Sequence, residues 1–417
     1  MNHPLYVLQL NATNFVPDMG GIATYNHELA HHIGLRGHSV ELLTYPSAGP
    51  LRAGGFAYTI RPGRSFDLRE VVARGGSRAF LLRSLPPKVA GMTRVALRAL
   101  RIAPAGSRRV LWAMTWWPEG IAAWLAGRLR RVPYFVSAHG YEAVIPKTAR
   151  RHLLYRSVMG QAAAVFAVSR HTAGLLELCG VPPERIRVIP NGVDPDRFRL
   201  TAEVAARMSD LRRRFLLDGC YVLLTIARLT ERKGHMAVLR ALAALRGAAP
   251  DLRYVIAGEG PMRPRLEEAV VGLRLEGVVA FAGEVSEPDK LALLHGSDVF
   301  VMPNRDIPLG KGGVDTEGFG MVFLEAAACG KPVVAGRAGG AVEAVVDGCT
   351  GILVDPLDDG EVREALQKLR RDRELAARLG RAGLARVKRD FTWVRISETY
   401  CNELEAGSRQ TDRSRLE

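Results

Sequence analysis

Short apolar runs alternate with helical spacing along the first half of the chain. Residues 6–10 form an apolar run, and the apolar positions of 22–35 then recur every three or four residues, as on one face of a helix. Gly37 supplies a helix stop, and residues 40–44 predict the next strand. Further strands are expected at 109–114, 134–137 and 165–168, with helical stretches between them. This alternation predicts parallel βαβ units.

The same pattern begins again after a segment full of turn residues. Residues 189–195 read Ile-Pro-Asn-Gly-Val-Asp-Pro and mark the best domain boundary. Beyond them we expect strands at 221–226, 252–257, 278–282, 299–302 and 332–335, and helices at 235–246, 263–273 and 321–329. Each half therefore reads as a Rossmann-like, doubly wound α/β domain, in which ligands bind beyond the carboxyl ends of the strands. Two such domains facing each other would enclose a central cleft.

Charge distinguishes the two halves. The chain has 417 residues, 47% hydrophobic and 24% charged, a composition that excludes a disordered or fibrous protein. The formal net charge of +15 predicts an anionic partner, which could be nucleic acid, a membrane surface or a phosphorylated substrate. Residues 1–190 hold 24 basic and 9 acidic side chains, whereas the remainder holds 34 of each. The densest stretch, 61–109, carries 12 basic residues, so we expect the two halves to have different tasks.

Cysteines and apolar runs indicate the compartment. The five cysteines include no C-x-x-C pair, which argues against a disulfide framework or a zinc site and suits a reducing cytosol. No apolar run approaches the roughly 18 residues that span a bilayer. The run Leu5–Leu10 is too short for a signal peptide. We therefore expect a cytoplasmic protein that could lie on a membrane without crossing it.

The strongest chemical signal lies in residues 315–325. Glu317 and Glu325 stand eight residues apart, with a Gly-Phe-Gly turn after the first and a helix that carries the second. The glycines let backbone N–H groups approach a ligand closely, and the start of the helix favours an anion such as phosphate. Two carboxylates beside such a site suggest a nucleotide sugar, which offers both hydroxyls and phosphates. Taken alone, the segment is more typical of a capped helix with surface glutamates, because two glutamates at a fixed gap are common.

Six motifs in the same order extend this signal over about 330 residues. Residues 315–325 resemble the E-x₇-E region of the retaining glycosyltransferases of family 4, which have the GT-B fold. The other matching motifs are Gly20-Gly21, Ser137-Ala-His139-Gly140, Ile189-Pro-Asn-Gly-Val-Asp194, Ala227-Arg228-Leu-Thr-Glu-Arg-Lys233-Gly234, Gly258-Glu-Gly260-Pro and Gly330-Lys-Pro-Val-Val334. One departure is Ala227, where the family usually has glycine. The chain resembles the bacterial exopolysaccharide and phosphatidylinositol mannosyltransferase-like members.

The resemblance gives the motif residues roles. Arg228 and Lys233 would neutralise the donor diphosphate, whose charge grows as the sugar departs. Glu325 would accept hydrogen bonds from the ribose, while Glu317 and His139 would contact the transferred sugar and are the expected catalytic residues. The other expected donor contacts are Gly20, Gly21, Val285, Phe319, Gly320, Met321 and Val322. Outside the motif context, these residues would read as a surface charge pair, a loop histidine and tight turns.

The resemblance also implies a domain plan and a reaction. Residues 1–190 would bind the acceptor, residues 191–390 the nucleotide-sugar donor, and 391–417 would form a helix that crosses back to the first domain before a polar, frayed tail from about residue 407. Such enzymes retain the anomeric configuration, by the favoured account through front-face attack. We expect no metal or other cofactor, because the literal D-x-D string Asp194-Pro-Asp196 sits in a turn where Pro and Asp are ordinary.

Loop composition and charge suggest a donor and an acceptor. The Pro- and Gly-rich loop 302–315 is longer than the simplest family members need and is a weak pointer to a mannosyl or related hexosyl donor linked to GDP or UDP. The basic first half would place the enzyme at an anionic membrane surface that carries a lipid-linked or glycan acceptor. Trp116-Trp117 could stack on acceptor sugars or fill a core. A soluble small-molecule acceptor is the alternative.

Rival functions remain open from the sequence. A basic nucleic-acid-binding protein is favoured only by the charge, since the basic stretch lacks interleaved aromatics and a recognition motif. A GT-B epimerase or phosphorylase would keep the fold and change the chemistry. The sequence does not identify the sugar, the base or the acceptor.

Overall fold

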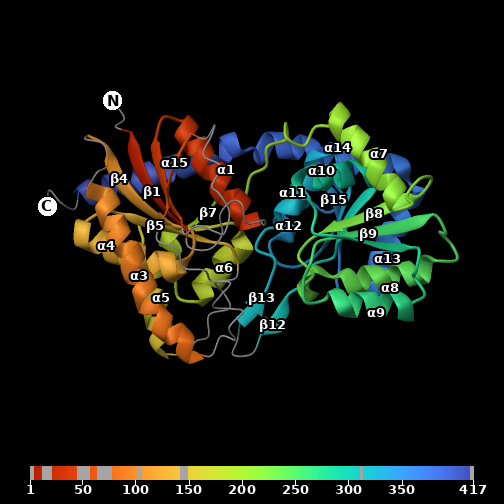
Figure 1. The fold of residues 1–417 in the computed structure, drawn as a ribbon, viewed down its shortest axis with the longest axis horizontal. Coiled ribbons are helices and arrows are strands. Elements are labelled where there is room, and N and C mark those ends of the chain that lie inside the picture. Colours follow the sequence, from red (N-terminus) through yellow and green to blue (C-terminus); the bar gives the residue numbers. More distant parts are fainter. Residues whose placement is uncertain are drawn as a thin grey trace. The chain divides into compact units, whose positions relative to one another are not determined.

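The chain folds into two compact units. The computed structural model describes residues 4–11, 21–44, 57–62, 78–101, 103, 106–140, 149–309 and 313–413. Unit 1 consists of Met1–Asn191 with Trp393–Glu417, and unit 2 consists of Gly192–Thr392 (Figure 1). Each unit has its own parallel sheet with helices packed against it.

The sheet of unit 1 has the strand order β3-β2-β1-β4-β5-β6-β7 among the described residues, and every pairing is parallel. The strands are β1 (Leu5–Asn11), β2 (Ser39–Thr44), β3 (Thr59–Pro62), β4 (Arg108–Ala113), β5 (Tyr134–Ala138), β6 (Ala164–Ala167) and β7 (Ile186–Val188). The helices are α1 (Gly21–Leu35), α3 (Arg78–Arg101), α4 (Ile121–Arg130), α5 (Ala149–Gly160), α6 (Arg170–Leu178) and α15 (Trp393–Arg413), with short helical turns η1 (Trp116–Gly120) and η3 (Pro183–Arg185).

The two faces of this sheet differ in chemistry. One face carries Leu8, Leu111 and Val136, which join an apolar core with buried residues of α3, α4 and α5. Alternation along each strand sends Gln9 and Trp112, which are neighbours in register, to the opposite face. That face is covered by α1 and α15 and holds buried polar and aromatic side chains.

The sheet of unit 2 has the order β10-β9-β8-β11-β14-β15, again with parallel pairings. Its strands are β8 (Tyr221–Ile226), β9 (Leu252–Ala257), β10 (Val279–Gly283), β11 (Val299–Met302), β14 (Val333–Gly336) and β15 (Gly351–Val354), and a separate antiparallel pair joins β12 (Ile307–Leu309) to β13 (Gly313–Asp315). The helices are α7 (Ala202–Arg214), α8 (His235–Leu245), α9 (Arg263–Gly272), α10 (Glu287–Gly296), α11 (Met321–Ala328), α12 (Ala341–Ala344), α13 (Asp359–Arg371) and α14 (Arg373–Asp390), with a 3₁₀ turn η4 (Glu231–Lys233).

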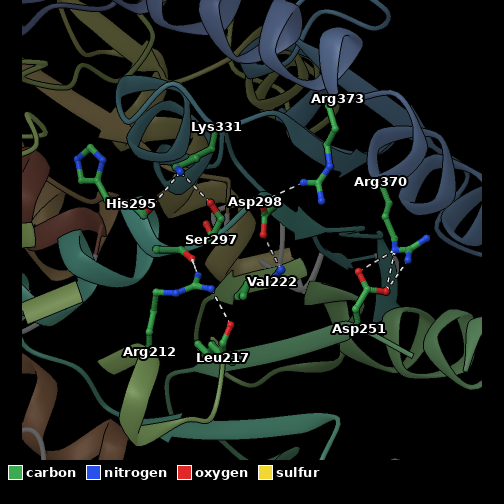
Figure 2. A network of polar contacts seen from close by, with 11 residues as sticks. Arg212, Leu217, Val222, Asp251, His295, Ser297, Asp298, Lys331, Arg370 and Arg373 are labelled. Atoms are coloured by element: carbon green, nitrogen blue, oxygen red, sulfur yellow. Dashed lines mark hydrogen bonds and ion pairs between the residues drawn. The ribbon is translucent and has the colours of Figure 1, made fainter. Parts of the chain in front are cut away.

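Charged side chains anchor the amino ends of the strands in unit 2. Asp298, just before β11, accepts a hydrogen bond of 2.7 Å from the backbone N–H of Val222 and forms an ion pair with Arg373 (Figure 2). Lys331, before β14, donates to the carbonyl oxygens of His295 and Ser297 at the end of α10. These contacts are structural, and they include Lys331 of the Gly330-Lys-Pro-Val-Val334 motif.

Most of the predicted elements are confirmed, and the differences have physical reasons. The strands β3, β7 and β15 and the β12–β13 pair were not predicted. The first three combine a length of three or four residues with a position at the edge of a sheet, and β12 and β13 have three residues each. The expected frayed tail is wrong for residues 407–413, which continue α15. Gly407 lies so close to Phe135 that a Cβ atom there would come within 2.6 Å of its ring, and Ser408 is buried, so packing on the sheet holds this end of the helix. No described helix is both long and apolar enough to cross a membrane.

Candidate active site

The turn after β8 places Arg228 and Lys233 in unit 2. Residues Glu231–Lys233 form the 3₁₀ turn η4, which ends at Gly234 in the left-handed region (φ 76°). A Cβ atom at Gly234 would lie 2.0 Å from the carbonyl oxygen of Pro303, so only glycine fits between this turn and the segment after β11. The motif Lys-Gly thereby fixes Lys233 at the carboxyl end of the sheet.

Glu317 lies buried between two cations. Lys233 Nζ donates a short hydrogen bond to Glu317 Oε2, and Arg232 Nη1 donates to the same oxygen at 2.6 Å. Arg232 also pairs through Nε with Asp315 at 3.1 Å. Glu317 and Lys233 are 9% and 8% exposed, so this is a largely desolvated charge cluster.

Burial and pairing compete in setting the ionisation of this cluster. Burial raises the pKa of Glu317, but the charges and hydrogen bonds of Lys233 and Arg232 outweigh it, so the pKa lies below its ordinary value. Burial, together with the charge of Arg232, lowers the pKa of Lys233 below its ordinary value, although Glu317 opposes this. Glu317 is therefore an anion at neutral pH, and it can accept hydrogen bonds from a ligand's hydroxyl groups.

Glycines shape the backbone between Glu317 and α11. Gly320 has φ 87° and is the N-cap of α11, and a Cβ atom there would lie 2.4 Å from the ring of Phe323. Gly340 donates its N–H to the carbonyl oxygen of Glu317 at 2.7 Å, and this hydrogen bond fixes the backbone of Glu317. Phe319 is buried against Phe391, with ring centroids 5.8 Å apart. Within the described residues no side chain caps α11, so its first N–H groups, including those of Met321 and Val322, suit an anion.

Glu325 and Glu317 pair with different cations in the described residues. Glu325 lies on α11 and pairs with Lys290 at 3.1 Å, and Lys290 also pairs with Glu287 at 3.0 Å. Burial opposes the charge of Lys290, but the two carboxylates outweigh burial and raise its pKa. The Lys290 ammonium lies 5.6 Å from the ring centre of Phe198. The two glutamates of the E-x₇-E motif therefore belong to two separate charge clusters.

Arg228 and Val285 occupy the neighbouring turns. Arg228 is exposed and makes no ion pair with the described residues, so its guanidinium is available to a ligand. Val285 is half-buried between β10 and α10, beside Gly283 in the left-handed region (φ 68°). Both residues follow the carboxyl ends of their strands.

His139 follows β5 in unit 1. Its Nε2 lies 3.2 Å from the carbonyl oxygen of Met114, and its ring meets that of Tyr25 edge-on with centroids 4.8 Å apart. Burial lowers the pKa of His139 to about 4, although the hydrogen bond to Met114 opposes this, so the imidazole is neutral at pH 7. Gly21 begins α1 and is exposed, whereas Gly20 lies outside the described residues.

Sequence reasoning missed Arg232 and Lys290. Arg232 stands beside Lys233 in the motif, and that adjacency was the available signal. Lys290 lies on α10, 35 residues from its partner Glu325, and carried no signal.

The contacts of Asp194 and Trp116 bear on two interpretations that the sequence leaves open. In the Asp194-Pro-Asp196 string, Asp194 accepts a hydrogen bond of 3.0 Å from the N–H of Asp196, as turn-forming aspartates do. In the described part of the chain no three His, Cys, Asp or Glu side chains form a group that could hold a metal ion. Trp116 packs on Tyr155 at the edge of the apolar core, with ring centroids 5.3 Å apart, which favours a packing role for it.

Comparison with known proteins covers both units. Residues 209–386 match the family model described as glycosyl transferases group 1, and residues 19–197 match the model described as Glycosyltransferase Family 4. A GDP-mannose-dependent alpha-(1-6)-phosphatidylinositol monomannoside mannosyltransferase of Mycolicibacterium smegmatis is 32% identical over 95% of this chain and 99% of its own length. A D-inositol 3-phosphate glycosyltransferase of Stackebrandtia nassauensis is 30% identical over 91% of this chain and 85% of its own.

Solved structures share the fold at lower identity. Anabaena HepE in complex with UDP and glucose superposes with a TM-score of 0.75 at 20% identity, over 96% of this chain and all of that one. The sucrose-phosphate synthase of Thermosynechococcus elongatus gives 0.74 at 21% identity, over 95% and 98% of the two chains.

Proposed function

Since this chain belongs to the family 4 glycosyltransferases with the GT-B fold, we propose that it transfers mannose from GDP-mannose to a phosphatidylinositol-type glycolipid. The observation that carries this choice is the 32% identity, over nearly its whole length, to a relative named for GDP-mannose and phosphatidylinositol monomannoside. The weaker pointer from loop 302–315 to a mannosyl donor agrees with it.

The charge cluster of unit 2 suits the donor side of this reaction. Arg228 is exposed and Lys233 is near the start of α11, so both would bind the diphosphate and stabilise its growing charge as the bond from the sugar C1 to the phosphate oxygen breaks. Glu317 would bind donor-sugar hydroxyls and Glu325 the ribose. The acceptor hydroxyl would form the new bond on the same face of the sugar and give its proton to the leaving phosphate oxygen, so the product keeps the anomeric configuration.

Turnover with defined substrates tests donor and acceptor together. Purified full-length chain is incubated with GDP-mannose or UDP-glucose, and with phosphatidylinositol monomannoside in detergent micelles. We expect GDP release and an α-linked mannosyl product with GDP-mannose. A β-linked product would contradict retention, and faster turnover of UDP-glucose would contradict the choice of donor.

A soluble phosphorylated acceptor is the second candidate. It is favoured by relatives 30% identical that are named D-inositol 3-phosphate glycosyltransferases, and by the basic charge of the first half of the chain. The same assay with inositol 3-phosphate in place of the glycolipid separates the two. The better acceptor is the one with the higher kcat/KM.

Peripheral membrane binding goes with the lipid acceptor. The whole charge surplus lies in residues 1–190, and each basic side chain near an anionic surface contributes about 1 kcal/mol. Residues 63–77 of the 61–109 stretch fall outside the described residues. We expect the chain to sediment with vesicles that contain anionic phosphatidylinositol and not with neutral phosphatidylcholine vesicles. Equal sedimentation would contradict membrane binding.

The donor site is proposed to work without a metal ion or other cofactor. The chain is also proposed not to bind nucleic acid. Arg228 and Lys233 would supply the positive charge that Mg²⁺ or Mn²⁺ gives in metal-dependent transferases. Activity should therefore survive EDTA. A loss of activity that Mn²⁺ restores would overturn this part of the proposal.

A further inference from the structure

A buried polar layer lies beneath α1 and α15 in unit 1. Trp112 on β4 pairs in register with Gln9 on one side and Phe135 on the other, so the three side chains share one face of the sheet. Ser137 and then His139 follow Phe135 at intervals of two residues. Ser137 therefore belongs to this face, and the strand leads directly to the histidine.

Tyr25 of α1 stands at the centre of this layer. Its hydroxyl oxygen lies 2.7 Å from the hydroxyl of Tyr400 on α15 and 3.2 Å from Ser137 Oγ. Ser137 Oγ also accepts a hydrogen bond of 3.0 Å from Trp112 Nε1. Burial raises the pKa of Tyr25 to about 12, so its hydroxyl stays protonated. The hydroxyl bonds hold the ring of Tyr25 from two elements that are distant in sequence, β5 and α15.

The ring of Tyr25 also packs against the ring of His139. The two rings meet edge-on at 4.8 Å, close to perpendicular at 85°. Trp393, the first residue of α15, packs on the same tyrosine with centroids 6.1 Å apart. A change at the Tyr25 hydroxyl can therefore act on the imidazole directly through the tyrosine ring.

We infer that Tyr25 and Tyr400 are positioning residues for His139, and that α15 contributes to the reaction through this tyrosine pair. The inference rests on the proposed glycosyltransferase function and on the role that the family resemblance implies for His139, a contact with the transferred sugar. Tyr400 is fully buried, so it would act through Tyr25 and not on the substrate itself. Its hydroxyl holds the Tyr25 ring in the one orientation that supports the imidazole.

The test compares Tyr400→Phe and Tyr25→Phe with Tyr134→Phe. Tyr134 is a matched control, because it lies on the same strand as Ser137 but on the opposite face, and its hydroxyl donates a buried hydrogen bond of 2.7 Å to the carbonyl oxygen of Val158. With GDP-mannose and phosphatidylinositol monomannoside, Y400F should lower kcat about threefold to tenfold, the size of one lost hydrogen bond. Its KM for GDP-mannose should stay within about twofold, and Y134F should keep both constants.

Coupling to the histidine separates positioning from general loss of stability. In the His139→Gln background, adding Y400F should change kcat by less than about twofold, because the ring that it positions is already gone. An equal further loss in that background would overturn the inference. If H139Q itself kept full activity, the proposed role of His139 would fail instead, so the two failures are distinguishable.

A second readout needs no turnover. The ¹⁵N shifts and the titration of the His139 imidazole, assigned by comparison with H139Q, report its environment directly. Y400F should raise the pKa of His139 towards the ordinary value as water reaches a looser ring, and Y134F should leave it at about 4. Unchanged imidazole signals in both Y25F and Y400F would overturn the inference even where the donor or acceptor had been misassigned.

Discussion

At the scale of single residues, Glu317 shows how a carboxylate can be kept charged in a buried environment. Two cations, Lys233 and Arg232, share its Oε2 atom, and Asp315 balances Arg232. A buried carboxylate without such partners would take up a proton. The pairing therefore keeps an acceptor of hydrogen bonds ready where a donor sugar would bind.

Glu317→Gln tests this role with little change of shape. The amide keeps the volume but loses the charge, and charged hydrogen bonds contribute about 1.5–3 kcal/mol each, so kcat/KM for GDP-mannose should fall about tenfold to a hundredfold. Initial rates over a range of GDP-mannose concentrations measure it. The control is Glu364→Gln on α13, where the carboxylate is 73% exposed, and it should match the wild type. Equal rates for E317Q and the wild type would contradict the assignment.

His139 should make stability depend on pH. Its pKa is about 4 in the folded chain, against 6.5 for an unperturbed histidine. Between these values the unfolded state binds the extra proton, so the free energy of unfolding rises with pH from about 4 to 6.5 and falls as the medium is acidified. His139→Gln should lose less stability than the wild type over this window. Urea unfolding at pH 4.5 and 7 measures the difference, and parallel losses in the two proteins would contradict it.

At the scale of elements, α15 continues through residue 413 because it packs on the sheet of unit 1. Gly407→Ala should destabilise the chain, since its Cβ atom would meet the Phe135 ring at 2.6 Å. Gly174→Ala in α6 is the matched control, because it has open space around it and should gain the roughly 0.5–1 kcal/mol that alanine adds to a helix interior. Thermal unfolding compares the two. A higher melting temperature for G407A would mean that the helix end is not packed there.

Lys331, which lies outside α10, caps the carboxyl end of that helix. Lys331 Nζ donates hydrogen bonds of 2.8 Å and 2.7 Å to the carbonyl oxygens of His295 and Ser297 (Figure 2). Lys331→Met should therefore cost about 1.5–3 kcal/mol in the free energy of unfolding. Lys368→Met on α13, whose side chain is exposed, should cost less than about 0.5 kcal/mol. Urea titration gives both values, and equal costs would contradict the capping role.

Sequence reading succeeded where local pattern decides the structure. Strands of five or six apolar residues such as 221–226, and helices with periodic apolar faces such as 235–245, have signals of their own. Glu317 and Lys233 were found because a motif carried them. Arg232 and Lys290 were missed because their importance comes from partners 85 and 35 residues away, which only the folded backbone brings within reach.

At the scale of the whole molecule, the residues assigned to the donor diphosphate, sugar and ribose lie mainly in unit 2, and the positive charge surplus lies in the sequence of unit 1. The electrostatics of the two tasks are thus separated. A diphosphate needs a few local cations such as Arg228 and Lys233, whereas a membrane surface or an inositol phosphate would respond to the charge of the whole unit.

This separation predicts that a nucleotide stabilises unit 2 and leaves the strands of unit 1 unchanged. A ligand that binds only the folded state stabilises it by about 2.7 kcal/mol at a hundred times its Kd, so GDP should raise the melting temperature more than UDP at equal concentration if GDP-mannose is the donor. Hydrogen exchange should show GDP protecting residues 226–234 and 316–325 in unit 2 and leaving β1 and β2 of unit 1 unchanged. Lys233→Met should remove most of the shift, while K368M keeps it. Stronger stabilisation by UDP would reassign the base, and protection confined to unit 1 would contradict the placement of the donor site.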